Sequence, residues 1–187
     1  MYDTSDIRKN LKIVIDGYPY AVVDHQFVKP GKGQAFTRTK LKNMITGAVL
    51  EKTFKSGEKL EKADMEERQM QYLYPDGDQW VFMDTTTYAQ LPLGAEVLQD
   101  TPSYLQDGMM VDVLFFSDKP IGVTPPTFVE LEVTETEPGF KGDTSSNITK
   151  PATVTTGKIV NVPIFVNIGD MLKIDTRTGE YVERVKK

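Results

Sequence analysis

A lysine flanked by two glycines is the most distinctive chemical feature of the sequence, in the run Lys29, Pro30, Gly31, Lys32 and Gly33. Pro30-Gly31 suits the central positions of a type II turn, in which glycine adopts a positive φ. Because Lys32 has no bulky neighbour, its ammonium group can enter a narrow space. A Walker-type phosphate loop does not fit, since no Ser or Thr follows this lysine. The alternative is an exposed hairpin tip whose lysine serves solubility.

Three further cations follow at alternating positions, Arg38, Lys40 and Lys42. On a strand these side chains share one face. With Lys29 and Lys32 they could form a surface for nucleic-acid phosphates, acting through charge and counterion release. The alternative is the solvent face of a half-buried strand.

Other candidates are weaker. Aromatic side chains on a predicted hairpin could stack on bases, but their segment is acidic, so core packing is favoured; they are Tyr72, Tyr74, Trp80 and Phe82. Acidic residues recur in pairs and could imitate catalytic carboxylates, but solvated strand faces are favoured; they are Glu130, Glu132, Glu135 and Glu137.

Composition excludes several classes of function. The 187 residues contain no Cys and a single His, His25, so no thiolate or His-rich metal site is expected, and no metal is predicted. No stretch approaches the roughly 20 apolar residues of a membrane helix, and the start of the chain is polar and acidic. We therefore expect a cytoplasmic protein without a membrane span, and not an enzyme.

Charge divides the chain unevenly. Residues 1–62 carry 12 basic and 7 acidic residues, residues 63–127 carry 2 and 11, and residues 128–187 carry 8 and 9, for a total net charge of −5. A basic first third on an acidic chain indicates a local anionic partner.

Short strands must position these residues. Leu11–Ile15 and Tyr18–Val23 predict a hairpin whose turn is Asp16-Gly17, with Pro19 confined to an edge or the beginning of its strand. Further strands are expected at 34–42, 49–54, 70–74, 79–83, 109–116, 119–123, 128–134, 157–166, 170–174 and 181–185. A short or broken helix is expected at 94–106, and a polar loop at 137–151.

This pattern predicts an all-β protein of small barrels. Boundaries near 63 and 127 give three domains, at 1–63, 64–127 and 128–187.

Five segments, in order, resemble bacterial elongation factor P over essentially the whole chain. They are Phe27–Phe36, Val49–Ser56, Val123–Leu131, Gly139–Thr144 and Lys150–Tyr181, the last with interruptions. The resemblance implies an SH3-like, KOW-type barrel followed by two OB-type barrels in an elongated L-shaped arrangement that mimics tRNA. It also implies a translation elongation factor that binds the ribosome beside peptidyl-tRNA and relieves stalling at consecutive prolines.

The resemblance also assigns residues. Lys32 falls on the position that many members modify covalently, and β-lysylation by an enzyme resembling a lysyl-tRNA synthetase is the expected extension, with no other cofactor. Lys29, Pro30, Gly31 and Gly33 belong to the same tRNA-binding tip. Gly142, Asp143 and Thr144 match the loop of the third domain that contacts the ribosome and the exit-site codon.

Two other readings of the sequence stay open. One is a paralogous elongation-factor-P-like protein, although the intact Pro30-Gly31-Lys32-Gly33 tip favours the factor itself. The other is a non-ribosomal OB-fold protein that binds single-stranded RNA, which the net charge of −5 disfavours. For the elongation factor itself, a monomer is expected.

Overall fold

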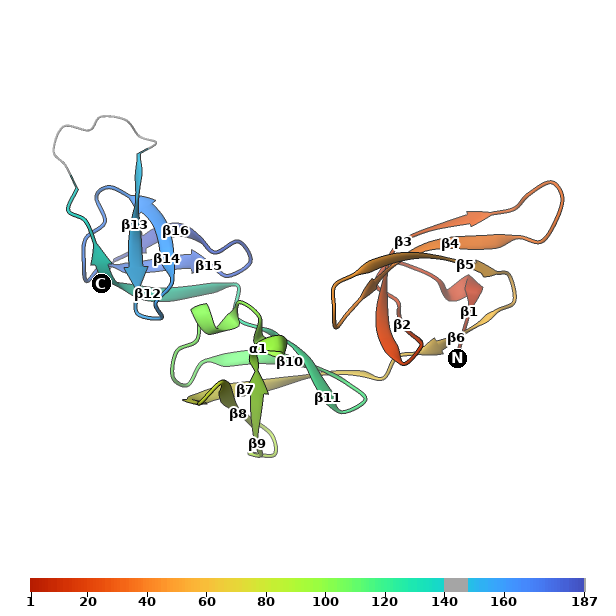
Figure 1. The fold of residues 1–187 in the computed structure, drawn as a ribbon, viewed down its shortest axis with the longest axis horizontal. Coiled ribbons are helices and arrows are strands. Elements are labelled where there is room, and N and C mark those ends of the chain that lie inside the picture. Colours follow the sequence, from red (N-terminus) through yellow and green to blue (C-terminus); the bar gives the residue numbers. More distant parts are fainter. Residues whose placement is uncertain (140–147, 187) are drawn as a thin grey trace. The chain divides into compact units, whose positions relative to one another are not determined.

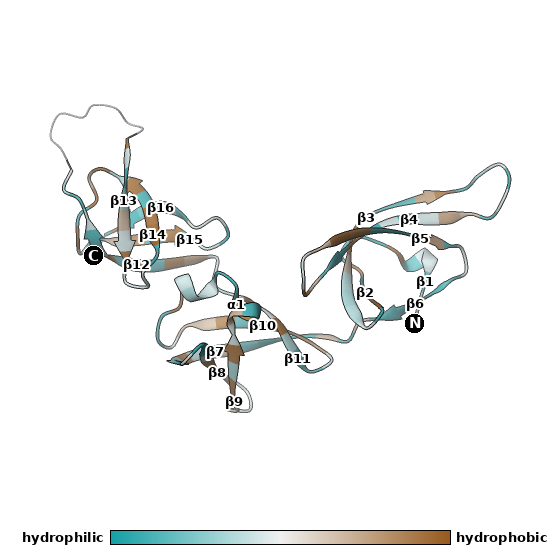
Figure 2. Ribbon diagram, viewed as in Figure 1, coloured by the Kyte–Doolittle hydropathy of each residue, from teal (hydrophilic) through white to brown (hydrophobic). Residues whose placement is uncertain are grey.

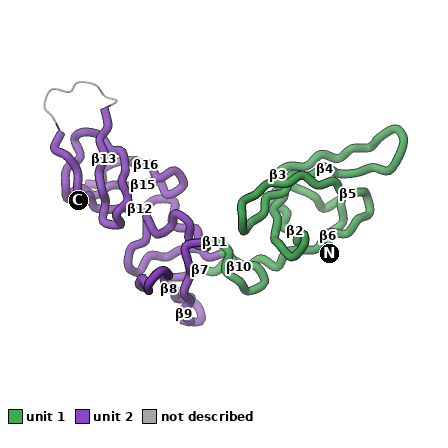
Figure 3. The backbone as a smooth tube through the Cα atoms, in the orientation of Figure 1, with its two compact units in different colours: residues 1–68, 114–122 green, residues 69–113, 123–187 purple. Residues whose placement is uncertain are grey.

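The structure, a computed structural model, describes residues 1–139 and 148–186. Its strands form three sheets (Figure 1), which confirms the predicted all-β class. The chain divides into two compact units (Figure 3), one of residues 1–68 and 114–122 and one of residues 69–113 and 123–187. The boundaries at 63 and 127 stay a prediction.

The first sheet contains the candidate tip. Its strand order is β1 (Tyr2–Asp3), β6 (Lys59–Lys62), β2 (Lys12–Ile15), β3 (Tyr18–Val28), β4 (Phe36–Asn43) and β5 (Val49–Lys55). A 3-10 turn, η1 (Thr4–Asp6), follows β1. The predicted hairpin is confirmed, because Asp16 and Gly17 have φ values of 51° and 81°, as the tight turn between β2 and β3 requires. Pro19 lies at the beginning of β3, as expected.

A hydrophobic core supports this sheet. Leu41 of β4 and Ile13 of β2 are almost completely buried, together with Val22 of β3 and Phe54 of β5. Buried and exposed residues alternate along β4, and the strands of this sheet carry both hydrophilic and hydrophobic residues (Figure 2). Leu41 lies with Thr37, Thr39 and Asn43 on the buried face of β4, which leaves the other face to solvent.

The second sheet has the order β11 (Lys119–Thr124), β10 (Met110–Phe116), β7 (Met65–Asp76), β8 (Gln79–Asp84) and β9 (Gln90–Gly94). The predicted helix is short and broken, as expected: only α1 (Ala95–Leu98) and the 3-10 turn η2 (Thr101–Ser103) form, and Pro102 is the second residue of η2. The strand β9, which contains Pro92, was not predicted. It lies at the edge of the sheet, where a missing N–H is tolerated.

The third sheet has the order β14 (Ile159–Pro163), β13 (Thr149–Val154), β12 (Phe128–Thr136), β15 (Met171–Asp175) and β16 (Glu180–Val185). The prediction of a loop up to Pro151 is wrong, because β13 begins at Thr149. Pro151 is tolerated there since β12 pairs with β13 only from Ala152 onward, and Pro151 opposes Asn161 of β14 alone.

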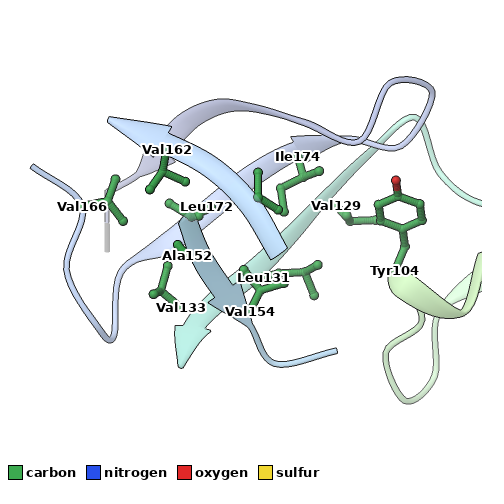
Figure 4. Close-up of a cluster of buried hydrophobic side chains, with 11 residues drawn as sticks. Tyr104, Val129, Leu131, Val133, Ala152, Val154, Val162, Val166, Leu172 and Ile174 are labelled. Carbon is green, nitrogen blue, oxygen red and sulfur yellow. The ribbon is translucent and has the colours of Figure 1, made fainter. Parts of the chain in front are cut away.

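Valine, leucine and isoleucine side chains fill the core of the third sheet (Figure 4), including Val129, Leu131, Leu172 and Ile174. Tyr104, which follows η2, is also part of this cluster and is only 4% exposed. The neighbouring residue Ser103 is also held, because Thr156 Oγ1 donates a hydrogen bond to Ser103 O at 2.6 Å. The loop after η2 is therefore attached to the third sheet within the same compact unit.

Candidate nucleic-acid interface

Residues 29–35 connect β3 to β4 and form the candidate tip (Figure 1). The last strand pair before the tip is Val28 opposite Phe36. The return side is anchored to the end of β5, since Gln34 Nε2 donates to Ser56 O at 2.8 Å and Ser56 N donates to Ala35 O at 3.0 Å. The Val28–Phe36 pair thus fixes where the tip begins, and the hydrogen bonds to Ser56 fix where it ends.

The expected type II turn at Pro30-Gly31 is wrong. Gly31 does not adopt a positive φ, whereas Gly33 has a φ of 97°. The bend spans residues 31–33, and Gly33 is the position in it that needs the conformational freedom of glycine.

Lys32 is exposed, as expected for a hairpin tip. No heavy atom lies within 4 Å of a Cβ placed on Gly31 or Gly33, so the space on both sides of this lysine is open. Within residues 1–139 and 148–186 its ammonium group forms no hydrogen bond or ion pair. Lys29 is exposed beside it, and Pro30 is partly buried. The roles assigned to these residues stay predictions.

Arg38, Lys40 and Lys42 alternate on the exposed face of β4, as the sequence predicted. Thr37, Thr39, Leu41 and Asn43 point inward between them and are at most 6% exposed. Thr39 satisfies its hydroxyl by donating to Lys52 O at 2.7 Å. The three cations are therefore brought together on one surface.

Side chains of the two neighbouring strands complete this surface. Gln26 and Asp24 of β3 oppose Arg38 and Lys40, and Thr53 and Glu51 of β5 oppose the same two cations from the other side. These residues line a shallow pocket of about 280 Å³. The Arg38 guanidinium lies 5.5 Å from the centre of the Phe36 ring, within the range of a cation–π contact.

The other candidate residues lie in the second and third sheets. Tyr72 and Phe82 are buried with ring centres 5.4 Å apart, which confirms core packing for these two, whereas Tyr74 is half-exposed. Burial and, to a smaller extent, Asp107 raise the pKa of Tyr72. Glu130 and Glu132 are exposed on β12, so the expected solvated face is confirmed.

Gly142, Asp143 and Thr144 lie outside the described residues, but the residues flanking them are described. A Cβ on Gly139 would lie 2.3 Å from Ile164 O, so only glycine fits there. Lys150 is buried and its ammonium group donates to Glu137 O. The Lys150 hydrogen bond joins residues on the two sides of this segment, and neither this bond nor the steric requirement at Gly139 was foreseen in the sequence.

A separate ion pair closes the turn between β15 and β16. Arg177 donates from Nη2 to Asp175 Oδ2 at 2.9 Å and from its backbone N to Asp175 Oδ1 at 2.8 Å. Donation from the Arg177 side chain, and then from its backbone, holds the pKa of Asp175 below its ordinary value. The carboxylate in turn raises the pKa of Arg177.

The described residues include neither a metal-binding cluster nor a membrane-spanning helix. Among the described residues, no group of three or more His, Asp or Glu side chains is arranged to hold a metal ion. No helix in the described part of the chain has the length and apolarity needed to cross a membrane.

Comparison with known proteins matches the residues of each sheet to a domain family. The elongation factor P KOW-like domain matches residues 3–60, the elongation factor P OB domain matches residues 65–123, and the elongation factor P C-terminal domain matches residues 129–184. Among solved structures, "Eukaryotic translation initiation factor 5A from Methanococcus jannaschii" is similar over 66% of this chain and 91% of that chain, with a TM-score of 0.55 and 26% identity. A KOW-like domain followed by an OB domain and the C-terminal domain of the same family thus defines the chain as a non-enzymatic translation factor.

Full-length relatives specify the family. Elongation factor P of Thermoanaerobacter sp. (strain X514) is 56% identical over 185 residues, which cover 99% of this chain and 100% of the relative. That of Desulfotalea psychrophila is 54% identical over 187 residues, covering both chains completely. The chain belongs to the elongation factor P family and is a translation elongation factor.

Proposed function

We propose that this elongation factor binds the ribosome beside peptidyl-tRNA and stimulates peptide-bond formation between consecutive prolines, thereby relieving stalling. The observation that carries this proposal is the exposed Lys32, placed at the turn of a long β3–β4 hairpin with open space on both sides. The site of action is the cytoplasm, and the active form is a monomer.

Proline is a poor nucleophile on the ribosome because its ring constrains both the amine and the approaching chain. A factor that orders the peptidyl-tRNA raises the rate through positioning, since an aligned reactant loses less entropy on reaching the transition state. No proton-transfer group of the factor is needed for this. The ribosome makes the bond, and the tip holds the substrate.

Covalent extension of Lys32 completes the tip in this proposal. A β-lysyl group, added by an enzyme resembling a lysyl-tRNA synthetase, lengthens the side chain and supplies a further cation. Charge-assisted hydrogen bonds from such cations to phosphate are shorter and stronger than neutral ones. The open surroundings of Lys32 leave room for this addition.

The segment containing Gly142, Asp143 and Thr144 provides the second contact with the ribosome in this proposal. Replacing Asp143 and Thr144 by Ala should weaken rescue while leaving the melting temperature nearly unchanged. A large fall in melting temperature would assign these residues to the fold instead.

Translation of paired reporters tests the proposed function. One template encodes a Pro-Pro-Pro insert and the other a matched insert without prolines, and both are translated in vitro with and without the factor. We expect stimulation of the proline template alone. Equal stimulation of both templates, or of neither, would overturn the proposal.

A further inference from the structure

The exposed surface of β3, β4 and β5 next to the tip is divided into rows by strand register. Residues directly opposite each other on neighbouring strands project on the same side of a sheet. Counting from the tip, we name four rows across β3, β4 and β5. They are Val28–Phe36–Lys55, Gln26–Arg38–Thr53, Asp24–Lys40–Glu51 and Ala21–Lys42–Val49.

Charge differs from row to row. Lys40 stands between two carboxylates, Asp24 and Glu51, so its row has a net charge of −1. The rows of Lys55 and Arg38 each have a net charge of +1, because their other members are neutral. The positive charge nearest the tip is therefore supplied by Lys55 and Arg38, and the next row toward the body of the sheet is acidic.

Lys55 and Arg38 are diagonal neighbours. Arg38 opposes Thr53, two residues before Lys55, and such diagonal pairs are about 7–8 Å apart. Within the described residues neither side chain forms an ion pair, and both are exposed. The Phe36 ring, which opposes Lys55, supports the Arg38 guanidinium at 5.5 Å. An arginine supported in this way loses less freedom when it binds a ligand.

We propose that Lys55 and Arg38 together bind a phosphate group of the RNA backbone beside the tip, whereas Lys40 is neutralised by its neighbours and contributes little. The inference rests on the proposed function, which supplies the RNA partner. Arg38 provides the planar donor pair suited to phosphate oxygens, and Lys55 adds a mobile point charge on the same side. The acidic Lys40 row then limits how far the RNA backbone extends over the sheet.

Lys52 supplies a matched control on the same strand. It is three residues from Lys55, so it projects from the opposite face, where its ammonium group lies 5.5 Å from the Phe54 ring. Lys52→Gln and Lys55→Gln remove the same charge from the same exposed strand. Only the second removes it from the proposed phosphate site.

Salt dependence separates direct phosphate contacts from general charge effects. Binding of the full-length chain to ribosomes carrying peptidyl-tRNA is measured over a series of KCl concentrations at fixed Mg²⁺. We expect Lys55→Gln and Arg38→Gln each to weaken binding and to reduce the slope of log K against log salt by about 0.7–0.9, the value for one phosphate contact. Lys52→Gln should leave the slope unchanged.

A gain-of-binding variant tests the acidic row. Asp24→Asn combined with Glu51→Gln leaves Lys40 without opposing carboxylates, so binding should strengthen and the slope should become steeper. Thermal melts confirm that each variant is folded.

The outcomes distinguish the two proposals. If the wild type binds and Lys55→Gln matches Lys52→Gln, the assignment of the phosphate pair is overturned while the proposed function stands. If the acidic-row variant binds no better than the wild type, Lys40 is not neutralised as proposed. If the wild type itself has no affinity for these ribosomes, the proposed function fails and the inference fails with it.

Discussion

Lys32 makes no contact that would stabilise the fold, because its side chain is exposed and its neighbours are glycines. We therefore expect Lys32→Ala to change the free energy of unfolding by less than about 0.5 kcal/mol, as at other exposed sites. The same variant should abolish rescue of the proline reporter. Thermal melts and the paired reporter assay measure the two effects side by side.

Lys32→Arg is the matched variant for charge. Arginine keeps the positive charge but removes the amine that would be modified, so rescue should also fail in a host that modifies lysine. Full activity of Lys32→Arg would show that a cation alone is sufficient at the tip.

Gly139 is required for a steric reason. Because an added Cβ would lie 2.3 Å from Ile164 O, we expect Gly139→Ala to destabilise the protein by about 1–3 kcal/mol, the usual cost of overpacking. Gly122 of β11 is the control, since no heavy atom lies within 4 Å of a Cβ there. Urea unfolding of both variants checks this expectation, and equal midpoints would contradict it.

Several of these residues could be located from the sequence, but not their backbone geometry. The exposure of Lys32 and the alternation of Arg38, Lys40 and Lys42 followed from residue type and spacing. The glycine with positive φ was misassigned, because turn type depends on where strand pairing stops, here at Val28 opposite Phe36. The carboxylates that face Lys40 come from two other strands, and only the register between strands places them there.

At the scale of elements, the tip depends on Gly33 rather than on Gly31. We expect Gly33→Ala to impair rescue, because a φ of 97° costs an alanine about 1–2 kcal/mol and the tip would adopt another conformation. Gly31→Ala should be tolerated, since its φ is not positive and its surroundings are open. The reporter assay compares the two alanine variants, and an equal loss of rescue would contradict this distinction.

Strand prediction succeeded where hydrophobic alternation was regular, and it missed two short strands, β1 and β6, and two strands that contain proline, β9 and β13. The burial of β12 alternates strictly from Phe128 to Val133, and this strand was expected. The strands β9 and β13 contain Pro92 and Pro151 and were missed. Neither proline lies where a neighbouring strand would require a hydrogen bond from its backbone N–H. Which positions these are depends on the order of strands in the folded sheet.

At the scale of the whole molecule, Tyr104 links the loop after η2 to the core of the third sheet. Its ring packs with Val129 and Leu131, and the Lys158 ammonium group lies 5.4 Å from the ring centre. Gln106 Nε2 adds a hydrogen bond of 2.9 Å to Glu130 O. Residues 69–113 and the third sheet thus share one compact unit for a specific packing reason.

Removing this ring should destabilise the protein strongly. We expect Tyr104→Ala to cost about 3–5 kcal/mol, as for other buried aromatic side chains, and Tyr104→Phe to cost less than about 1 kcal/mol because the ring is kept. Unfolding in urea, followed by circular dichroism, measures both values. A loss below about 1 kcal/mol for Tyr104→Ala would show that the two sheets are not coupled through this residue.

The place of Tyr104 in that core also has a consequence for how the protein folds during its synthesis. Ile174, which belongs to the same cluster, is synthesised 70 residues after Tyr104. At about 5–20 residues per second, the nascent chain holds this aromatic ring without its complete set of packing partners for roughly 4–14 s. The KOW-like domain, whose core residues run from Ile7 to Leu60, is complete in sequence long before that moment. A factor proposed to assist ribosomes at difficult sequences therefore finishes its own folding only when its last strands have left the ribosome.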